Sequence, residues 1–387
     1  MLTAKEIARY NRHLLLPEIG MKGQEKLKNS SVLVIGAGGL GCPVLMYLTA
    51  AGVGKIGIVD FDMVDESNLQ RQVLYDSIDI GKSKSEVAKH KLSKQNPLIE
   101  IESINSKLTT QNALEIFSGY TIIVDGTDNF STRYMVNDAC ALLGKTLVSG
   151  SIFKFQGQVS VFNFQNQKNE FGPTYRCLFP SPPSTESSTS CSEIGVIGVL
   201  PGIIGTLMAN EVVKIIVGIG EILSGKILLV DSLAMNFHTV EIERNSEAVK
   251  STPQNAEAFR RMDYDYFCGT KNNKLLVREI SPEKLFAMIS SKENIQLLDV
   301  REPNELPEVS ELNDLKVPIG EIEKHIEKIE RDRKVIVICR SGNRSRKAIE
   351  LLSEKFDFQN LYNLKGGVTE WIKHSAKNKK HERKEKT

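Results

Sequence analysis

One cysteine opens a loop suited to sulfur chemistry. Cys339 begins the run Cys-Arg-Ser-Gly-Asn-Arg, which follows the apolar segment VIVI and precedes a helix-like segment. Such a loop turns backbone N–H groups and a helix N-terminus toward the sulfur, which lowers the pKa of the thiol and favours a thiolate or persulfide anion. Arg344 closes the loop as C-x4-R, one residue shorter than the C-x5-R of phosphatases, and the smaller ring suits sulfur. We therefore predict a reactive Cys339 with Arg344 in its site.

A second candidate site is built from glycines. Gly36, Gly38, Gly39 and Gly41 form a GxGxxG run between a predicted strand and a predicted helix, and Asp60 ends the next strand. Glycine lets the backbone approach a phosphate, the helix N-terminus offers unpaired N–H groups, and the acid can bond a ribose hydroxyl. The pattern predicts a nucleotide but leaves NAD, FAD and ATP open.

Polar residues downstream favour ATP. Several cations converging on one phosphate chain, with an acid placed to hold Mg²⁺, suit ATP cleavage and have no use in a dinucleotide oxidoreductase. Asp128 is the expected metal ligand because it follows the third buried strand. An NAD-dependent oxidoreductase remains the alternative from another enzyme class. The polar set comprises Arg12, Ser67, Asn68, Arg71, Lys84, Asp128 and Asn129.

Strands and helices alternate around both sites, which predicts an α/β protein. The buried runs VLVI and IGIV fit a parallel sheet, so the first domain reads as a Rossmann-like doubly wound fold. A second, smaller α/β domain carries Cys339. The predicted organisation is residues 1–245 for the first domain, 246–275 for a linker, 276–375 for the second domain and 376–387 for a basic tail.

Composition narrows the class of protein. The chain has 387 residues, 41% hydrophobic, and a formal net charge of +2, so we expect two globular domains and no nucleic-acid partner. No secretory signal is visible at the N-terminus, which predicts a cytoplasmic protein. The apolar stretch 194–209 is short and interrupted by Pro201, which predicts a buried helix and no membrane association. The basic tail is expected to be solvated and disordered.

The other cysteines are scattered, which argues against a disulfide framework in a cytoplasmic protein. Cys191 stands near the end of the Ser-rich segment 181–192, which we expect to be an exposed loop. Cys42 and Cys140 fall in apolar helical segments and are expected in the core.

Six segments of the first domain resemble the E1-like activating enzymes of the MoeB/ThiF/HesA type, in the order of that family and over roughly residues 1–245. The resemblance implies ATP- and Mg²⁺-dependent adenylation of the C-terminal glycine of a ubiquitin-like sulfur-carrier protein ending in Gly-Gly. A molybdopterin pathway is favoured, with thiamine or another sulfur pathway as alternatives, and a scaffold that only docks the carrier is a further rival. The segments are RYNRHLLLPEIGMKGQEKL, GAGGLG, IVDFDMVDESNLQRQ, GKSKSEVAK, VDGTDNFSTRYMVNDAC and GVLPGIIGTLMANEVVK.

The resemblance also implies roles by position. Gly39 lies against the nucleotide, Asp60 takes the ribose, and Lys84 stabilises the leaving charge. Ser67, Asn68 and Arg71 reach the phosphates, and Asp128 with Asn129 places Mg²⁺. Arg12 comes from the partner subunit, so a homodimer is implied.

Residues 276–375 resemble a rhodanese-type sulfurtransferase, on LLDVRE, the Cys339 loop and LKGGVTEW. A persulfide on Cys339, supplied by a cysteine desulfurase or thiosulfate, would then convert the adenylated carrier to a thiocarboxylate. Cys191 matches a crossover-loop cysteine of the first family; it either resolves a disulfide with Cys339 or forms a thioester. Asp299 and Arg301 are expected to be structural.

One departure concerns zinc. Relatives commonly carry two CxxC pairs, but Cys177 and Cys268 have Thr174 and Asp265 at the partner positions. Two cysteines with a threonine and an aspartate match structural zinc poorly. We therefore predict no tight structural Zn²⁺, and near-equimolar zinc in chelator-washed protein would contradict this.

Overall fold

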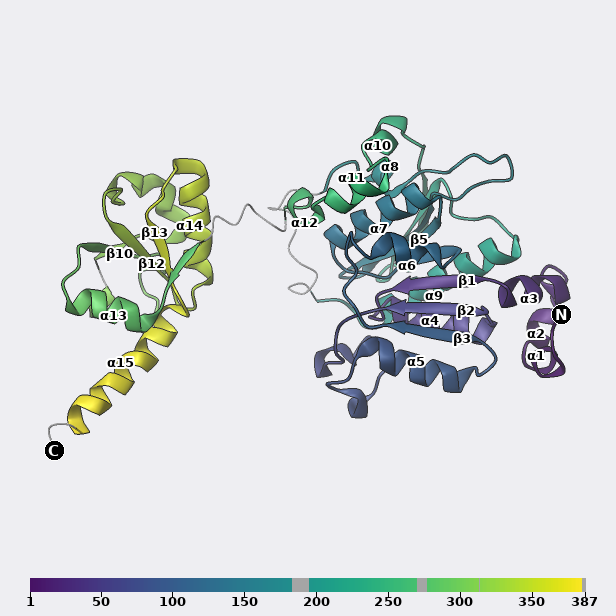
Figure 1. Ribbon diagram of the computed structural model, residues 1–387, viewed down its shortest axis with the longest axis horizontal. Helices are drawn as coiled ribbons and strands as arrows, with labels where there is room; N and C mark the ends of the chain where they lie inside the picture. Colours follow the sequence, from purple (N-terminus) through teal and green to yellow (C-terminus); the bar gives the residue numbers. More distant parts are fainter. Residues whose placement is uncertain (183–194, 270–276, 313, 385–387) are drawn as a thin grey trace. The chain divides into compact units, whose positions relative to one another are not determined.

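The computed structural model describes the chain except for residues 183–194, 270–276, 313 and 385–387. It confirms the predicted α/β class. Two compact units, Met1–Lys271 and Asn272–Thr387, are each built around one sheet (Figure 1).

The sheet of the first unit has eight strands in the order β3-β2-β1-β4-β5-β6-β7-β8. The five strands from β3 to β5 are parallel, and β6, β7 and β8 are added antiparallel. The first turn and the end of β4 therefore meet at one edge, as a doubly wound fold requires. The strands are β1 (Ser31–Ile35), β2 (Lys55–Val59), β3 (Glu100–Ile104), β4 (Ile122–Asp125), β5 (Thr146–Phe153), β6 (Gln156–Phe162), β7 (Lys226–Asp231) and β8 (Asn236–Glu241).

Alternating side chains of β1 supply two separate cores. Val32 and Val34 pack with one layer of helices, and Leu33 and Ile35 pack with the other. Burying each such side chain contributes roughly 1.5–3 kcal/mol. The first layer contains α3 (Gly20–Lys28), α4 (Gly41–Ala51), α5 (Lys84–Gln95) and α9 (Val199–Val217); the second contains α6 (Ala113–Ser118), α7 (Phe130–Leu143) and α8 (Tyr175–Leu178).

Helix α9 is the buried apolar helix, and it is longer than the sequence stretch suggested because it continues to Val217. Within the described residues it is the one helix that is long and apolar enough to cross a membrane. Its buried face, which includes Leu200, Ile204 and Met208, packs on α4, β5 and β6. The helix is therefore accounted for as part of the protein core.

Most of the predicted linker, residues 246–275, is instead part of the first unit. Three short helices, α10 (Ser246–Lys250), α11 (Ala256–Arg261) and α12 (Tyr264–Phe267), bury Phe259 and Tyr264 in the second core. Side chains of Asn245, Asn255 and Asp263 cap their N-termini. The segment looks polar in sequence because such short helices bury only one or two large side chains each.

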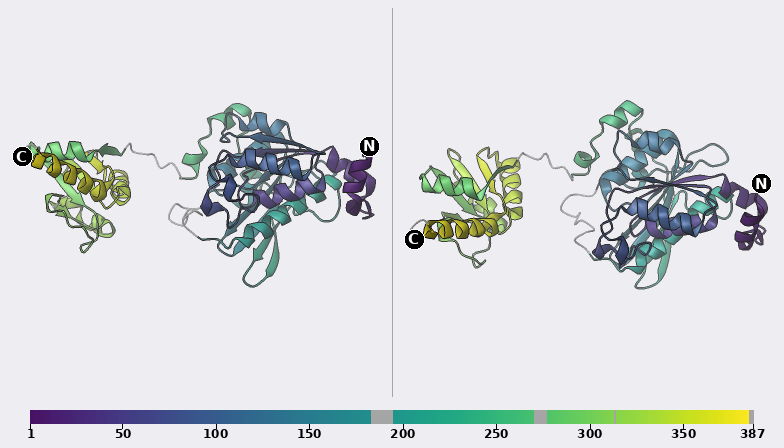
Figure 2. Two further views of the ribbon diagram at one scale, coloured as in Figure 1. Left: turned by 90° about the horizontal axis from the view of Figure 1, so that it is seen from below. Right: turned by 60° about the horizontal axis from the view of Figure 1, so that its bottom comes forward.

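The second unit has a five-stranded parallel sheet in the order β11-β10-β12-β13-β9. One face of β12 packs on α14, and the other packs on α13 and α15 (Figure 2). The elements are β9 (Arg278–Ile280), α13 (Pro282–Ser290), β10 (Ile295–Asp299), β11 (Leu315–Lys316), β12 (Lys334–Ile338), α14 (Asn343–Phe356), β13 (Leu361–Leu364) and α15 (Gly367–Lys384).

The expected disordered tail, 376–387, is a continuation of helix α15 as far as Lys384. Lysine and arginine are good helix formers, so α15, whose first turns bury Trp371, can extend through the basic residues. The remaining elements are α1 (Ala4–Arg9), α2 (Asn11–Leu14) and the 3-10 segments Glu66–Asn68, Ser77–Asp79, Ser310–Leu312 and Ile319–Lys328.

Candidate active sites

The glycine turn connects β1 to α4 through a backbone that only glycine allows. Gly36 has φ +86°, in the left-handed region. A Cβ at Gly41 would collide with the carbonyl oxygen of Gly36, and a Cβ at Gly39 would stand 3.1 Å from Pro201 Cβ. Close packing of the turn against α4 and α9 therefore fixes these positions.

Asp60, directly after β2, holds this turn in place. Its Oδ2 accepts the N–H of Ala37 at 2.7 Å, and its Oδ1 accepts the N–H of Asp62 at 2.8 Å. Burial raises the pKa of Asp60, although these two N–H groups and the cation of Lys84 oppose the rise. Each oxygen retains a further lone pair, so the carboxylate can still accept a ribose hydroxyl.

Two predicted cations lie around the turn. The stem of Arg71 passes over Gly39, with its Cγ 3.7 Å from where a Cβ would stand, and its Nη1 donates to Ser67 O at 3.0 Å. Lys84, the first residue of α5, is 6% exposed and places Nζ 3.0 Å from Asp62 Oδ2. The structure thus brings Arg71 to the turn and Lys84 to the segment that follows β2.

Ser67 and Asn68 lie in the 3-10 segment beside Arg71. The Ser67 N–H and hydroxyl both donate to Asp65 Oδ1, at 2.9 and 2.6 Å. Asn68 Nδ2 is 3.4 Å from Ser67 Oγ. Their side chains remain on the surface next to Arg71, where the resemblance predicted phosphate contacts.

Asp128 and Asn129 follow β4, the strand beside β1. Asn129 Oδ1 caps α7 by accepting the Thr132 N–H at 2.9 Å. The preceding residues are fixed because Asp125 Oδ1 accepts the N–H and hydroxyl of Thr127, at 2.9 and 2.6 Å. Asp128 itself is exposed at this edge, and a free carboxylate is a suitable Mg²⁺ ligand.

Arg12 lies elsewhere. It is exposed on α2, which packs on α3, and α3 leads into the beginning of β1 (Figure 1). The glycine turn follows the other end of β1. Arg12 therefore lies near the opposite edge of the sheet from the turn of its own subunit.

Gln72 is a site residue that sequence reasoning did not single out. It is 4% exposed, and its Oε1 has no hydrogen-bond partner. Its Nε2 is 3.6 Å from where a Cβ of Gly38 would stand, so the amide lies against the glycine turn. The polar run 67–72 was the signal, but nothing in it distinguishes buried Gln72 from exposed Gln70.

Cys339 follows β12 and is 1% exposed. Its Sγ accepts the Gly342 N–H at 3.1 Å and lies 3.3 Å from Ser345 Oγ. Burial alone would raise the pKa of this thiol. Hydrogen bonds from Ser345 and from the backbone N–H groups of Ser341, Gly342 and Ser345 outweigh it, so the pKa lies below its ordinary value.

Arg344, the arginine that closes the C-x4-R loop, has its guanidinium paired with a carboxylate from outside the loop. It forms a two-pronged pair with Glu305, with Nη1 2.7 Å from Oε2. The carboxylate satisfies two guanidinium N–H groups at once. Asp299 and Arg301 are 2% exposed and paired at 2.7 Å, and Arg301 also donates to Pro307 O, which agrees with a structural role.

The remaining cysteines differ in their surroundings. Cys191 lies outside the described residues. Cys42 and Cys140 are fully buried, and burial raises the pKa of Cys42 to about 12 and that of Cys140 well above its ordinary value. These two are core residues, as predicted.

The environment of Cys177 does not fit zinc. Its Sγ is 3.4 Å from both Thr174 Oγ1 and the N–H of Asn245, and neither is a zinc ligand. Cys268 is buried in the second core, where burial raises its pKa to about 11. Among the described residues there is no group of three or more His, Cys, Asp or Glu that could hold a metal ion. These residues fit structural zinc poorly, and the lack of tight zinc stays a prediction.

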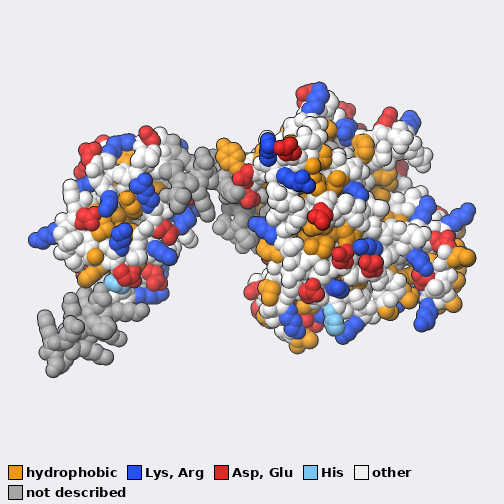
Figure 3. All heavy atoms as spheres, viewed as in Figure 1, with side chains coloured by type: hydrophobic (Ala, Val, Ile, Leu, Met, Phe, Trp, Pro, Cys, Tyr) orange, Lys and Arg blue, Asp and Glu red, His pale blue; other side chains and the backbone are white. Residues whose placement is uncertain are grey.

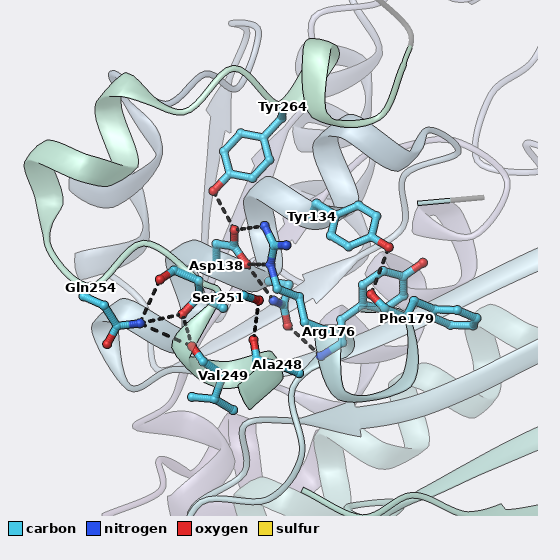
Figure 4. Close-up of polar contacts among 12 residues, drawn as sticks. Tyr134, Asp138, Arg176, Phe179, Ala248, Val249, Ser251, Gln254 and Tyr264 are labelled. Atoms are coloured by element: carbon cyan, nitrogen blue, oxygen red, sulfur yellow. Dashed lines mark hydrogen bonds and ion pairs between the residues drawn. The ribbon is translucent and has the colours of Figure 1, made fainter. Parts of the chain in front are cut away.

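Arg176, which precedes Cys177 in α8, forms a buried ion pair (Figure 4). Arg176 of α8 donates to both oxygens of Asp138 of α7, at 2.8 and 2.7 Å, and Tyr264 of α12 donates to Asp138 Oδ2 at 2.8 Å. The guanidinium also stacks on Phe267, 4.6 Å from the ring centroid. Side-chain contacts thus join three helices here.

Comparison with known proteins identifies both units. Residues 10–251 match the ThiF family, and residues 281–374 match the rhodanese-like domain. The chain is 42% identical over 378 residues to a probable adenylyltransferase/sulfurtransferase MoeZ of Mycobacterium tuberculosis, covering 96% of this chain and 94% of the relative. It is 41% identical over 388 residues to the adenylyltransferase and sulfurtransferase MOCS3 of Aedes aegypti, covering 96% and 87%.

Two further matches cover a smaller part of the chain. A sulfur carrier protein adenylyltransferase of Thermus thermophilus is 49% identical over 269 residues, covering 70% of this chain and 99% of the relative. A crystal structure of E. coli MccB with MccA-N7isoASN has a TM-score of 0.52 and 25% identity, covering 58% of this chain and 67% of that one. The chain therefore belongs to the ThiF family and, with its rhodanese-like domain, is an enzyme of the adenylyltransferase and sulfurtransferase class.

Proposed function

We propose that this enzyme adenylates the C-terminal glycine of a ubiquitin-like sulfur-carrier protein with ATP, and then converts it to a thiocarboxylate with sulfur from Cys339. The observation that carries the proposal is the presence, in one chain, of a glycine turn with Arg71 over it and Lys84 at the segment after β2, and of a buried cysteine held by N–H donors. Carboxylate activation and sulfur donation are complementary steps.

The adenylation step needs positioning and charge neutralisation. The carrier's carboxylate attacks the α-phosphorus of ATP, and pyrophosphate leaves, so no enzyme nucleophile is required. Asp60 would hold the ribose, Arg71 and Lys84 would neutralise the phosphates, and Asp128 would hold Mg²⁺. Magnesium, when bound, neutralises the charge that develops on the phosphate oxygens.

The sulfur step uses the second unit. The terminal sulfur of a Cys339 persulfide attacks the acyl carbon, the C–O bond to AMP breaks, and an acyl disulfide to Cys339 remains. A second thiol then attacks the Cys339 sulfur, which releases the carrier as a thiocarboxylate and leaves an enzyme disulfide. Cys191 is the proposed second thiol. A thiol reductant must then reduce this disulfide to two thiols, after which a cysteine desulfurase or thiosulfate would reload the persulfide on Cys339.

A homodimer would complete the first site by supplying Arg12 from the partner. The position of α2 near the opposite edge of the sheet supports this. Leu15 and Leu16, between α2 and α3, and Met21 of α3 are exposed, and hydrophobic side chains gather on this part of the surface in Figure 3. Beside Arg71, an apolar cavity of about 610 Å³ opens between α4, α9 and the exposed Phe237. Unpartnered apolar surface of this kind suits a second copy.

Molybdopterin synthesis is the proposed pathway, on the fusion of the two domains and the RYxR N-terminus; thiamine or another sulfur pathway would use the same chemistry. The alternative function, an NAD-dependent oxidoreductase, requires that the protein binds NAD(H). A fluorescence titration measures this binding. We propose that the reactions take place in the cytoplasm.

The test is the intact mass of a Gly-Gly carrier after incubation with the enzyme, MgATP and thiosulfate. We expect the carrier to gain the mass of one oxygen exchanged for sulfur with wild type and with Cys177→Ala, the matched thiol control, but not with Cys339→Ala. A carrier that is adenylated but gains no sulfur in any protein would refute Cys339 as donor. A carrier that is never adenylated would refute the first half.

A further inference from the structure

Three buried polar side chains lie close together where β12 and β13 end. Cys339, Ser345 and Asn363 are 1%, 0% and 2% exposed. Ser345 Oγ lies 3.3 Å from Cys339 Sγ and 2.6 Å from Asn363 Oδ1. The serine hydroxyl is thus within reach of two acceptors, one of which is the reacting sulfur.

A serine hydroxyl carries a single hydrogen and can donate it to only one acceptor at a time. When Cys339 is a neutral thiol, its S–H can donate to Ser345 Oγ while the hydroxyl donates to Asn363. When the sulfur is an anion, it becomes the stronger acceptor, and a charge-assisted bond from Ser345 stabilises it. The affinity of Asn363 for the serine proton therefore opposes formation of the anion.

Asn363 also lies close to the other donor to the sulfur. Its Nδ2 is 3.6 Å from where a Cβ of Gly342 would stand, and the Gly342 N–H donates to Sγ. Gly342 has φ +95°, a backbone conformation that residues other than glycine rarely adopt, so the loop conformation beside Asn363 depends on this glycine. One amide is thus packed against both groups that hold the sulfur.

We propose that Asn363 is a positioning residue that sets the reactivity of Cys339 through the shared proton of Ser345. Ser345 touches the reacting atom and is the catalytic partner, whereas Asn363 acts only through it. Sulfur donation by Cys339 rests on the proposed function, but the protonation of its thiol can be measured without any carrier.

Charged groups around the loop also affect the protonation of Cys339, so the test must leave them unchanged. Arg344 is paired with Glu305, and the Asp299–Arg301 pair lies at the end of the neighbouring β10. The exposed Arg340 belongs to the loop itself. Glu370 of α15 packs near Gly366. All these residues are unchanged in the variants below.

The experiment measures alkylation of Cys339 by iodoacetamide in the full chain as a function of pH, with peptide mass spectrometry separating Cys339 from the other cysteines. Asn363→Asp offers a stronger acceptor to Ser345 and should raise the apparent pKa of Cys339 by about one unit. Asn363→Leu has a similar volume and no acceptor, so it should lower that pKa. Loss of packing alone would move both variants in the same direction.

A double-mutant comparison separates the shared proton from the direct field of the new charge. In a Ser345→Ala background, Asn363→Leu should leave the pKa of Cys339 unchanged, and Asn363→Asp should raise it by less than half as much as with Ser345 present. Equal shifts with and without Ser345, or shifts of the same sign for both variants, would overturn the proposal. If the alkylation results hold and no thiocarboxylate forms, the proposed function fails and this inference stands.

Discussion

Glu305 is the residue that decides how much of the charge of Arg344 is available beside the reactive cysteine. The carboxylate occupies two guanidinium N–H groups, and Arg344 holds the pKa of Glu305 below its usual value, chiefly through their hydrogen bonds. The pair is therefore intact at neutral pH and weakens only as pH falls through that lowered pKa. A small anionic donor such as thiosulfate must compete with Glu305 for the cation.

Glu305→Gln should therefore raise kcat/KM for thiosulfate. We expect about a two- to fivefold increase, because a partly exposed ion pair is worth up to about 1 kcal/mol. Glu308→Gln removes the same charge from an exposed position of the same segment and should have little effect. Initial rates of sulfur transfer to cyanide measure both, and the difference between Glu305→Gln and wild type should shrink at acid pH. A gain equal to that of the control would mean that only net charge matters.

Gln72 offers a second prediction at the scale of a residue. Its amide lies against the turn at Gly38 with an unpaired buried oxygen. Gln72→Glu would set a carboxylate beside the phosphates, and like charges in contact cost several kcal/mol, so ATP should bind at least about tenfold more weakly. Gln70→Glu makes the same change at an exposed neighbour. Calorimetric titration with a non-hydrolysable ATP analogue compares them; equal affinities for the two variants would remove Gln72 from the site.

At the scale of helices and strands, the packing of α8 and α12 on α7 depends on one buried ion pair. Arg176 and Asp138 are 2% and 0% exposed in their side chains, and Tyr264 shares Asp138. Arg176→Met leaves a buried carboxylate without its cation and should reduce the free energy of unfolding by about 3–5 kcal/mol. Arg261→Met breaks an exposed pair on α11 and should change little. Urea unfolding measures both.

Adding Asp138→Leu to Arg176→Met should recover part of that loss, because no buried charge would remain. The double variant loses the Tyr264 hydrogen bond as well, so recovery should be incomplete. If the double variant were less stable than Arg176→Met alone, packing around Arg176 rather than charge would explain the cost.

Sequence was most informative where the pattern is local. The turn at Gly36 and the loop at Cys339 each lie between one strand and the next helix, so residue spacing alone placed them. It was least informative where partners are distant in the chain. Glu305 is 39 residues from Arg344, and Tyr264 is 126 residues from Asp138, so neither contact has a local signature. Helices α10 to α12 were missed inside the predicted linker for another reason, because such short helices bury only one or two large side chains each.

At the scale of the whole molecule, the chain joins an adenylyltransferase domain and a rhodanese-like domain, and the proposed function requires both to act on the same carboxylate. Composition and net charge argued against a nucleic-acid-binding protein, and the alternation of strands and helices predicted two α/β domains. The first domain proved longer, to Lys271, because the short helices after Asn245 belong to its core. In the proposed homodimer Arg12 would act in the site of the partner subunit, so its role would depend on a second copy of the chain.

Mixing two inactive variants tests whether Arg12 acts across a dimer. Arg12→Ala and Lys84→Ala should each lose most ATP–pyrophosphate exchange with a Gly-Gly carrier. If Arg12 serves the partner's site, a heterodimer of the two variants contains one fully intact site and one doubly defective site. Random reassociation makes half of the dimers heterodimers, so about a quarter of wild-type activity should return.

If Arg12 instead served its own subunit, every site in the mixture would carry one defect, and activity would stay at the level of the single variants. Co-expression with two different affinity tags isolates the heterodimer, in which activity should approach half of wild type. A mixture of Lys84→Ala with Arg71→Ala is the matched control, because both residues would serve the nucleotide site of their own subunit, and no mixed dimer then regains an intact site. If activity also returned in that control, the activity regained in the first mixture could not be assigned to Arg12 of the partner subunit.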